Sequence, residues 1–187
     1  LKLAVFDFDC TLTSSHVFAS LAGVGKSTSP KLTVPPPYAR TETGQLERLR
    51  ELDADPDWGS GVFALRAFGG PSRVEQLRCL LEALRNDSVE CMILSRGMVR
   101  VIRRCLEQVD LLSFFSHVLG SEGCSMGSTD YDDALTVNNP LPTQLGHLPD
   151  KCMRYKVETL QRVMEERNLN FDQTLFVDDE FADVDEN

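Results

Sequence analysis

Two aspartates stand one residue apart in the segment VFDFDCTLT, directly after an apolar run. In a β-strand, residues i and i+2 point to the same side, so Asp7 and Asp9 would crowd one face unless the backbone bends there. Two like charges that close repel each other, and something must compensate them. The spacing therefore raises the question of which group offsets this charge.

A second acidic group follows another apolar run near the end of the sequence. Asp178 and Asp179 come directly after TLFV, and Asp183 follows shortly afterwards. If both apolar runs are parallel strands, all of these carboxylates arrive at one edge of the sheet. Several carboxylates can lie this close together if a hard divalent cation lies among them. Mg²⁺ is the natural candidate because it prefers few carboxylates plus water and phosphate oxygens. The alternative is a solvated acidic tail.

Apolar runs alternate with amphipathic segments along the rest of the sequence. Short apolar runs predict strands, and apolar residues at a period of 3.6 predict helices. The expected strands are residues 1–8, 88–97, 116–120 and 174–179, and the expected helices are residues 69–85, 98–111 and 155–167. Strands alternating with helices imply an α/β fold, a three-layer, Rossmann-like parallel sheet with right-handed crossovers. Ligands bind outside the carboxyl ends of such strands.

Residues 14–70 interrupt this alternation. Several prolines, with repeated Gly and Ser, break the pattern, and we expect one short helix over residues 41–52. This segment is interpreted as an irregular, cap-like insertion, and residues 1–13 and 71–187 as the core, incomplete at its C-terminus. AGVGKST approaches a phosphate-binding loop, but Ser20 stands where that motif needs Gly and no strand directly precedes it. A flexible loop is expected there instead.

Two further motifs join the aspartates in a pattern that resembles the haloacid dehalogenase superfamily of phosphohydrolases. The first motif of that family, DxDx[TV], matches DFDCT with Asp7, Asp9 and Thr11. The second, a Ser or Thr at the end of a strand, matches Ser95 in ILSRG. Dehalogenases of the superfamily lack the second aspartate, so the resemblance favours phosphoryl transfer.

The third and fourth motifs follow in order. The third is a lysine, assigned to Lys156 with Lys151 as the alternative, because the distance from Lys156 to Asp179 suits one helix and one strand. The fourth, an acidic pair or GDxxxD, matches VDDEFAD with Asp178, Asp179 and Asp183. The resemblance covers residues 2–13 and 71–183 but not the insertion, which by position would be the cap that closes over the site and selects substrates.

The resemblance implies a phosphomonoester hydrolase that works through an aspartyl-phosphate intermediate. Asp7 would attack phosphorus, and Asp9 would act first as general acid and then as general base. Ser95 would donate a hydrogen bond to a phosphoryl oxygen, and Lys156 would neutralise developing charge. The remaining substrate-binding candidates are Thr11, Arg96 and Gly97.

The resemblance also implies a Mg²⁺ site. Its ligands would be Asp7, the main-chain carbonyl of Asp9 and Asp179, with Asp178 as the alternative and Asp183 as a further ligand or a supporting group. The same residues permit phosphotransfer to an acceptor other than water. A binding or regulatory protein that keeps the fold without catalysis is the rival interpretation.

Composition narrows the class of partner. The chain has 187 residues and a formal net charge of −10, the wrong sign for binding nucleic acid or an anionic membrane, so a small phosphorylated molecule is the expected substrate.

The six cysteines form no CxxC pair, and Cys79, Cys91 and Cys105 fall within apolar segments. They are interpreted as reduced core residues of a cytoplasmic protein. No signal peptide is visible, but the chain begins with Leu1, as a processed or excerpted chain would. The three histidines are assigned no role.

Overall fold

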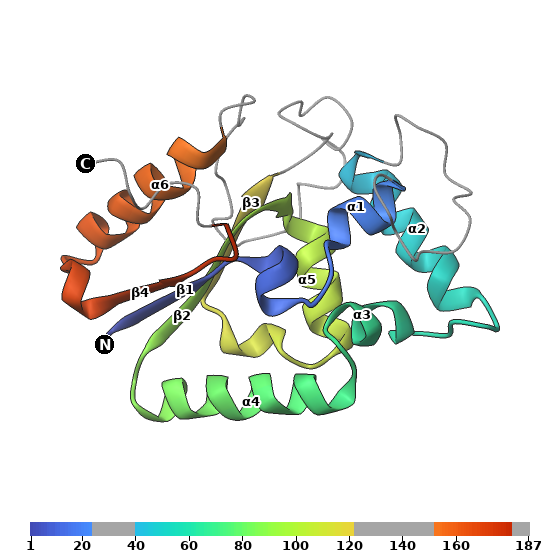
Figure 1. Cartoon of the computed structure of the whole chain (residues 1–187), viewed down its shortest axis with the longest axis horizontal. Helices are drawn as coiled ribbons and strands as arrows, with labels where there is room; N and C mark the ends of the chain where they lie inside the picture. The colour runs from blue at the N-terminus through green and yellow to red at the C-terminus, as the bar shows by residue number, and fades with distance from the viewer. Residues whose placement is uncertain (24–39, 122–151, 181–187) are drawn as a thin grey trace.

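A parallel β-sheet forms the centre of the molecule (Figure 1). The computed structural model describes residues 1–23, 40–121 and 152–180. Within them the strands are β1 (Leu3–Phe6), β2 (Glu90–Met98), β3 (His117–Ser121) and β4 (Thr174–Val177). Their order across the sheet is β3-β2-β1-β4, and all neighbours run parallel. The expected α/β class with a Rossmann-like parallel sheet is confirmed.

Helices cover both faces of this sheet, giving the three layers. Helix α6 (Cys152–Glu166) lies on one side, and α4 (Pro71–Asn86) and α5 (Val99–Gln108) pack on the other (Figure 1). Successive residues of a strand point to opposite faces. Leu3 and Val5 accordingly belong to the core under α6, while Ala4 and Phe6 belong to the larger core on the side of α4 and α5.

The order of the strands fixes where a ligand crevice can form. From β1 the chain moves to β2 and β3 in one direction, and then returns past β1 to β4. Right-handed crossovers in opposite directions require helices on opposite faces, which is why α6 lies on the face opposite α4 and α5. The direction changes between β1 and β4, so the crevice lies at their carboxyl ends. Asp7 and Asp178 follow directly after these two strands.

Helix α4 departs from the sequence prediction on its outer side. It begins at Pro71, where proline is tolerated in a first turn, and buries Val74 and Leu81. Cys79 is exposed, so its prediction as a core residue is wrong; it follows Val74 by five residues, which places it about 140° around the helix at 3.6 residues per turn. Leu80 is also largely exposed. Cys91 and Cys105 are buried free thiols, as expected.

The described part of residues 14–70 forms three helices: α1 (Val17–Ala22), α2 (Glu42–Ala54) and α3 (Val62–Ala67). The expected helix over residues 41–52 is confirmed as α2, whose first turn is capped by the Thr41 hydroxyl. All three helices contribute buried side chains to the same core cluster as Phe6. The division of the chain into a core and a cap stays a prediction. Among the helices of the described ranges, none has the length and apolar character that crossing a membrane requires.

Candidate active site

A buried lysine joins two aspartates at the carboxyl edge of the sheet. Asp7 is the first residue after β1, and its N–H donates to the Val177 carbonyl of β4 at 2.8 Å, so its position is fixed by the sheet. Lys156, in the first part of α6, lies 2.9 Å from Asp7 Oδ1 and 2.8 Å from Asp178 Oδ2 through its Nζ atom. Asp7 and Lys156 are each 5% exposed. Lys156 thus lies between the aspartates that follow β1 and β4, while the alternative, Lys151, lies outside the described residues.

Two opposing effects act on the pKa of Asp7. Burial raises the pKa of Asp7 because it removes the carboxylate from water, and the nearby Asp178 adds to the increase. Lys156 lowers that pKa through its charge and its hydrogen bond, but burial outweighs it. Additional positive charge beside Asp7 would therefore stabilise its ionised form, and a divalent cation is a group that supplies such charge.

Three carboxylates converge at this point. Asp7, Asp178 and Asp179 each place one oxygen within 4.8 Å of the others. Asp179 Oδ1 accepts a hydrogen bond from the Thr11 hydroxyl at 3.3 Å, and Asp178 Oδ1 accepts the Glu180 N–H at 3.0 Å. An all-oxygen set of this kind fits a hard cation such as Mg²⁺. Asp183 lies outside the described residues.

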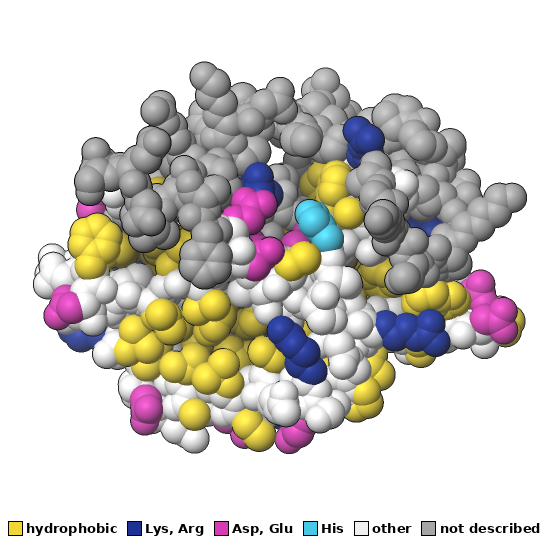
Figure 2. Space-filling view, viewed as in Figure 1, with side chains coloured by type: hydrophobic (Ala, Val, Ile, Leu, Met, Phe, Trp, Pro, Cys, Tyr) yellow, Lys and Arg dark blue, Asp and Glu magenta, His cyan; other side chains and the backbone are white. Residues whose placement is uncertain are grey.

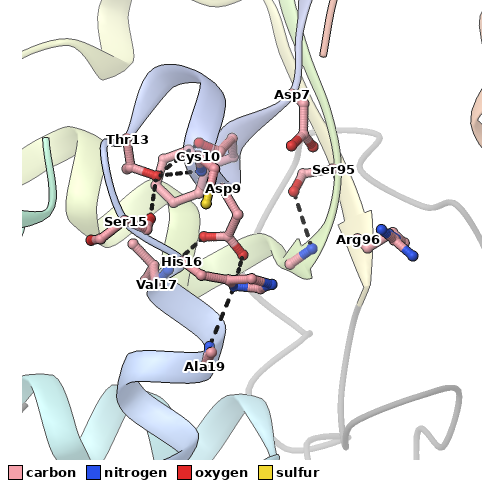
Figure 3. A network of polar contacts seen from close by, with 12 residues as sticks. Asp7, Asp9, Cys10, Thr13, Ser15, His16, Val17, Ala19, Ser95 and Arg96 are labelled. Atoms are coloured by element: carbon pink, nitrogen blue, oxygen red, sulfur yellow. Dashed lines mark hydrogen bonds and ion pairs between the residues drawn. The ribbon is translucent and has the colours of Figure 1, made fainter. Parts of the chain in front are cut away.

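The chain bends sharply after Asp7, which separates the two aspartates of the first motif. The bend, η1 (Phe8–Leu12), contains Cys10 in the left-handed region at φ 61°. Asp9 is carried away from the carboxylate cluster: its Oδ1 accepts the Val17 N–H at 2.7 Å, and its Oδ2 lies 2.9 Å from His16 Nδ1. In Figure 3 Asp9 points toward His16, whereas Asp7 lies beside Ser95. The expected crowding is therefore avoided by the bend.

Two side chains hold this bend in place. Thr13 is fully buried, and its hydroxyl lies 2.9 Å from the Phe8 carbonyl while accepting the Cys10 N–H at 3.2 Å. Arg73, in the first turn of α4, donates to the carbonyls of Leu12 and Thr11 at 2.6 and 2.9 Å. A non-glycine residue in the left-handed region costs roughly 1–2 kcal/mol, and these contacts offset part of that cost.

His16, Thr13 and Arg73 are residues of the site that sequence reasoning missed. Arg73 belongs to a helix that the sequence predicts, but its reach to the bend depends on how α4 packs. His16 stands at the N-cap position of α1, but nothing in the sequence connects it to Asp9. The hydrogen bond to Asp9 raises the pKa of His16.

Ser95 and Gly97 lie at the end of β2, next to Asp7. Ser95 is buried, and its hydroxyl accepts the Gly97 N–H at 3.1 Å, leaving the O–H without an acceptor among the described residues. A Cβ at Gly97 would lie 3.1 Å from Ile102 Cδ1, so a larger residue there would require the Ile102 side chain to move by a few tenths of an ångström. Ser95 therefore presents a hydroxyl donor beside the buried carboxylate (Figure 3).

Arg96 spans the edge of the sheet instead of pointing at Asp7. Its Nη2 lies 2.5 Å from Glu180 Oε2, so the side chain links the end of β2 to the residues after β4, and both partners are about two-fifths exposed. Figure 2 shows acidic, basic and histidine side chains gathered near the middle of the face in view. The structure thus brings together Asp7, Ser95, Lys156, Asp178, Asp179 and Thr11, and it turns the side chains of Asp9 and Arg96 to other partners.

No family model matches the chain, and no curated protein matches it. Solved structures are similar at low identity. A haloacid dehalogenase superfamily hydrolase (subfamily IA, variant 1) from Geobacter sulfurreducens is 20% identical over 97% of this chain and 79% of that one, with a TM-score of 0.41. A haloacid dehalogenase-like hydrolase from Streptococcus pneumoniae is 16% identical over 97% and 77%, with a TM-score of 0.44. A substrate-bound phosphoserine phosphatase is 15% identical over 95% and 77%, with a TM-score of 0.43.

Proposed function

We propose that this chain is a Mg²⁺-dependent phosphatase that hydrolyses phosphomonoesters through an aspartyl-phosphate on Asp7. The observation that carries the proposal is the buried Lys156 ammonium between Asp7 and Asp178, with the Ser95 hydroxyl beside Asp7 (Figure 3). A carboxylate nucleophile, a fixed cation and a hydroxyl donor at the mouth of a parallel sheet are the groups that phosphoryl transfer needs for positioning and charge neutralisation.

In the first half of the reaction an Asp7 carboxylate oxygen attacks phosphorus. The new bond from Asp7 to phosphorus forms as the bond from phosphorus to the leaving oxygen breaks, and Asp9 gives its proton to that oxygen, so the product leaves as a neutral alcohol. Ser95 and Lys156 bind the phosphoryl oxygens while charge moves onto them.

In the second half Asp9, now a carboxylate, takes a proton from water. The water oxygen attacks phosphorus, the bond to Asp7 breaks, and inorganic phosphate leaves with Asp7 restored as a carboxylate. Thr11 supports this arrangement through Asp179, its hydrogen-bond partner. Gly97, whose N–H donates to the Ser95 hydroxyl, stays a further substrate-binding candidate.

The residues that would hold Mg²⁺ are Asp7 and Asp179 through their side chains and Asp9 through its main-chain carbonyl. Asp178 is the weaker candidate because both of its oxygens already have partners, Lys156 on Oδ2 and the Glu180 N–H on Oδ1. When bound, the metal would supply positive charge to the phosphoryl oxygens and to Asp7. Asp183 stays a further candidate ligand.

The expected substrate is a small phosphorylated molecule. In a chain of net charge −10, an anion must be held by local positive groups, and Lys156 is the one that the site places at its base. Arg96 is available to a second anionic group only if it leaves Glu180. Among the residues that the structure describes, these charges favour a compact phosphate ester.

The test is hydrolysis of an aryl phosphate by the wild type and by Asp7→Asn, with and without Mg²⁺. Turnover should require Mg²⁺, stop on addition of a chelator, and fall at least about a thousandfold in Asp7→Asn, because an amide oxygen is a far weaker nucleophile. Asp172→Asn, at an exposed position before β4, is the control and should keep wild-type activity. Equal activity in wild type and Asp7→Asn would refute the proposal.

A further inference from the structure

The side chain of Asp9 is held by two partners, one on each oxygen. The Val17 N–H donates to Oδ1 at 2.7 Å, and His16 Nδ1 lies 2.9 Å from Oδ2. The Asp9 side chain is only 13% exposed, whereas that of His16 is 55% exposed. Both contacts come from the start of α1. The chain between the bend and α1 therefore turns back so that His16 and Val17 contact Asp9 (Figure 3).

The His16 contact requires a proton on Nδ1. Once Asp9 has given up its proton it is an ionised carboxylate, which is an acceptor only, so at 2.9 Å the imidazole must donate. The Ala19 N–H also lies 3.4 Å from Nδ1, but it is the longer contact and cannot be accepted by a nitrogen that already carries a proton. We therefore assign the hydrogen bond to Asp9 and regard Ala19 as a neighbour.

A carboxyl group that transfers a proton must be held in one orientation relative to the reacting oxygen. Asp9 stands in a bend whose next residue has a left-handed backbone, and its side chain has the usual staggered rotamers open to it. The negative charges of Asp7, Asp178 and Asp179 repel it from one side. Two hydrogen bonds on different oxygens select one orientation, and each oxygen keeps a lone pair that can carry the transferred proton. Correct orientation of this kind is worth a large factor in rate.

We propose that His16 is the positioning residue of the acid–base group Asp9, orienting it through the Nδ1–H bond without touching the reacting atoms. The inference rests on the proposed function, because Asp9 is a proton donor only if the chain transfers phosphoryl groups. It also gives the start of the insertion a part in the chemistry, since His16 and Val17 lie within residues 14–70.

The experiment uses a series of phosphate esters whose leaving groups differ in basicity. A p-nitrophenyl group leaves without help, whereas an alkyl group needs the proton from Asp9. His16→Phe keeps a ring but removes the donor, and His16→Asn keeps an N–H near the position of Nδ1 but removes the ring. We expect kcat/KM of His16→Phe to fall about tenfold to a hundredfold for alkyl phosphates, with a much smaller change for p-nitrophenyl phosphate.

His16→Asn should restore most of the lost kcat/KM toward alkyl phosphates, and Asp9→Asn should show the full dependence on the leaving group. A His16→Phe variant that loses the same factor with every ester would show a structural role and overturn the inference. Wild-type activity in His16→Phe, together with a loss in His16→Asn, would show that the ring packs and does not orient.

A second measurement does not depend on turnover. The amide proton of Val17 reports its bond to Asp9, and Asp9→Ala gives the NMR shift of the broken bond. We expect His16→Phe to move the Val17 resonance toward the Asp9→Ala position and His16→Asn to leave it near wild type. A Val17 resonance that is unchanged in His16→Phe would overturn the positioning role. Absence of turnover in wild type with every ester would instead refute the proposed function, and the Val17 shift would still decide what His16 does.

Discussion

Lys156 is the residue on which the candidate site depends most. Its ammonium is buried between two carboxylates, so the three groups together carry a net negative charge in a place from which water is largely excluded. Burying charges costs free energy, and their mutual attraction offsets that cost only while each has its partner. Removing the lysine leaves Asp7 and Asp178 facing each other without compensation.

We expect Lys156→Met to lower the free energy of unfolding by about 3 kcal/mol, the loss typical of removing one partner of a buried ion pair. Methionine keeps the length of the side chain, so the loss reflects charge more than volume. Urea denaturation followed by circular dichroism measures it. Lys2→Met, at an exposed position, is the matched control. A loss in Lys156→Met no larger than in the control would contradict the description of the ion pairs as buried and essential.

Some positions of the site can be predicted from the sequence, and others depend on the fold of the bend after β1. Asp7, Ser95 and Lys156 stand at the ends of strands or on a helix, and the positions of those elements follow from apolar periodicity. The partners of Asp9 and the reach of Arg73 depend instead on a bend in which Cys10 has positive φ. Nothing in the residue types before and after Cys10 fixes that dihedral, so His16 could not be assigned to Asp9 from spacing alone.

At the scale of elements, the end of the sheet opposite the site is held by a polar network. Arg167, just after α6, donates two hydrogen bonds to Glu90, the first residue of β2, at 2.9 and 3.0 Å. The Ser116 hydroxyl, just before β3, donates to the same carboxylate at 2.6 Å. One carboxylate therefore links the end of α6 to β2 and β3. These contacts help to hold α6, and with it Lys156, in position against the sheet.

Stability should depend on the ionisation of Glu90. Its hydrogen bonds with Arg167, followed by that with Ser116, lower the pKa of Glu90 below its ordinary value of 4.5. The folded state thus binds the proton less readily than the unfolded chain, so the stabilisation is present above the ordinary pKa and is lost as the pH falls through the folded one. Because the group is about one-third exposed, we expect about 1 kcal/mol.

The measurement compares the free energy of unfolding of the wild type and Glu90→Gln between about pH 7 and about pH 3. The difference should be present near neutral pH and vanish at the acid end. Glu82→Gln, at an exposed position on α4, should show no such difference. A difference between wild type and Glu90→Gln that stays constant down to the acid end would show that packing, not charge, is responsible.

The strands were predictable from their apolar runs, whereas helices were predictable only where they were long enough to show a periodic pattern. The sheet, α4, α5, α6 and the single expected helix of the insertion all follow from the sequence. Helices α1 and α3 have six residues each, less than two turns, so no period can show. The close approach of β3 to the end of β2 could also not be predicted from the sequence. A Cβ at Gly120 would lie 2.6 Å from the Gly97 carbonyl oxygen, and this constraint arises only from the pairing of the two strands.

At the scale of the whole molecule, the described insertion packs as part of the core. Leu49 and Leu52 of α2 are buried in the same cluster as Phe6. Polar contacts also join α2 to α5 at both ends: Glu42 accepts the Arg100 N–H at 2.7 Å, and Asp53 accepts from Gln108 at 2.7 Å. With a shared apolar core and two polar anchors, these helices and the sheet should unfold together.

The single tryptophan makes this cooperativity measurable. Trp58 lies between α2 and α3, where its ring packs 6.2 Å from that of Phe63 and 4.5 Å below the Arg66 guanidinium, so its fluorescence reports on the insertion. Far-UV circular dichroism reports on all helices and strands. We expect the two urea transitions to coincide. Leu49→Ala, on the insertion, and Leu3→Ala, on the opposite face of the sheet, should each shift both transitions together by about 3 kcal/mol, the usual cost of emptying a buried leucine site. An insertion that unfolded as a separate cap would behave differently: Leu49→Ala would then move the fluorescence transition and only the part of the circular dichroism signal that comes from the insertion helices, and Leu3→Ala would leave the fluorescence transition in place.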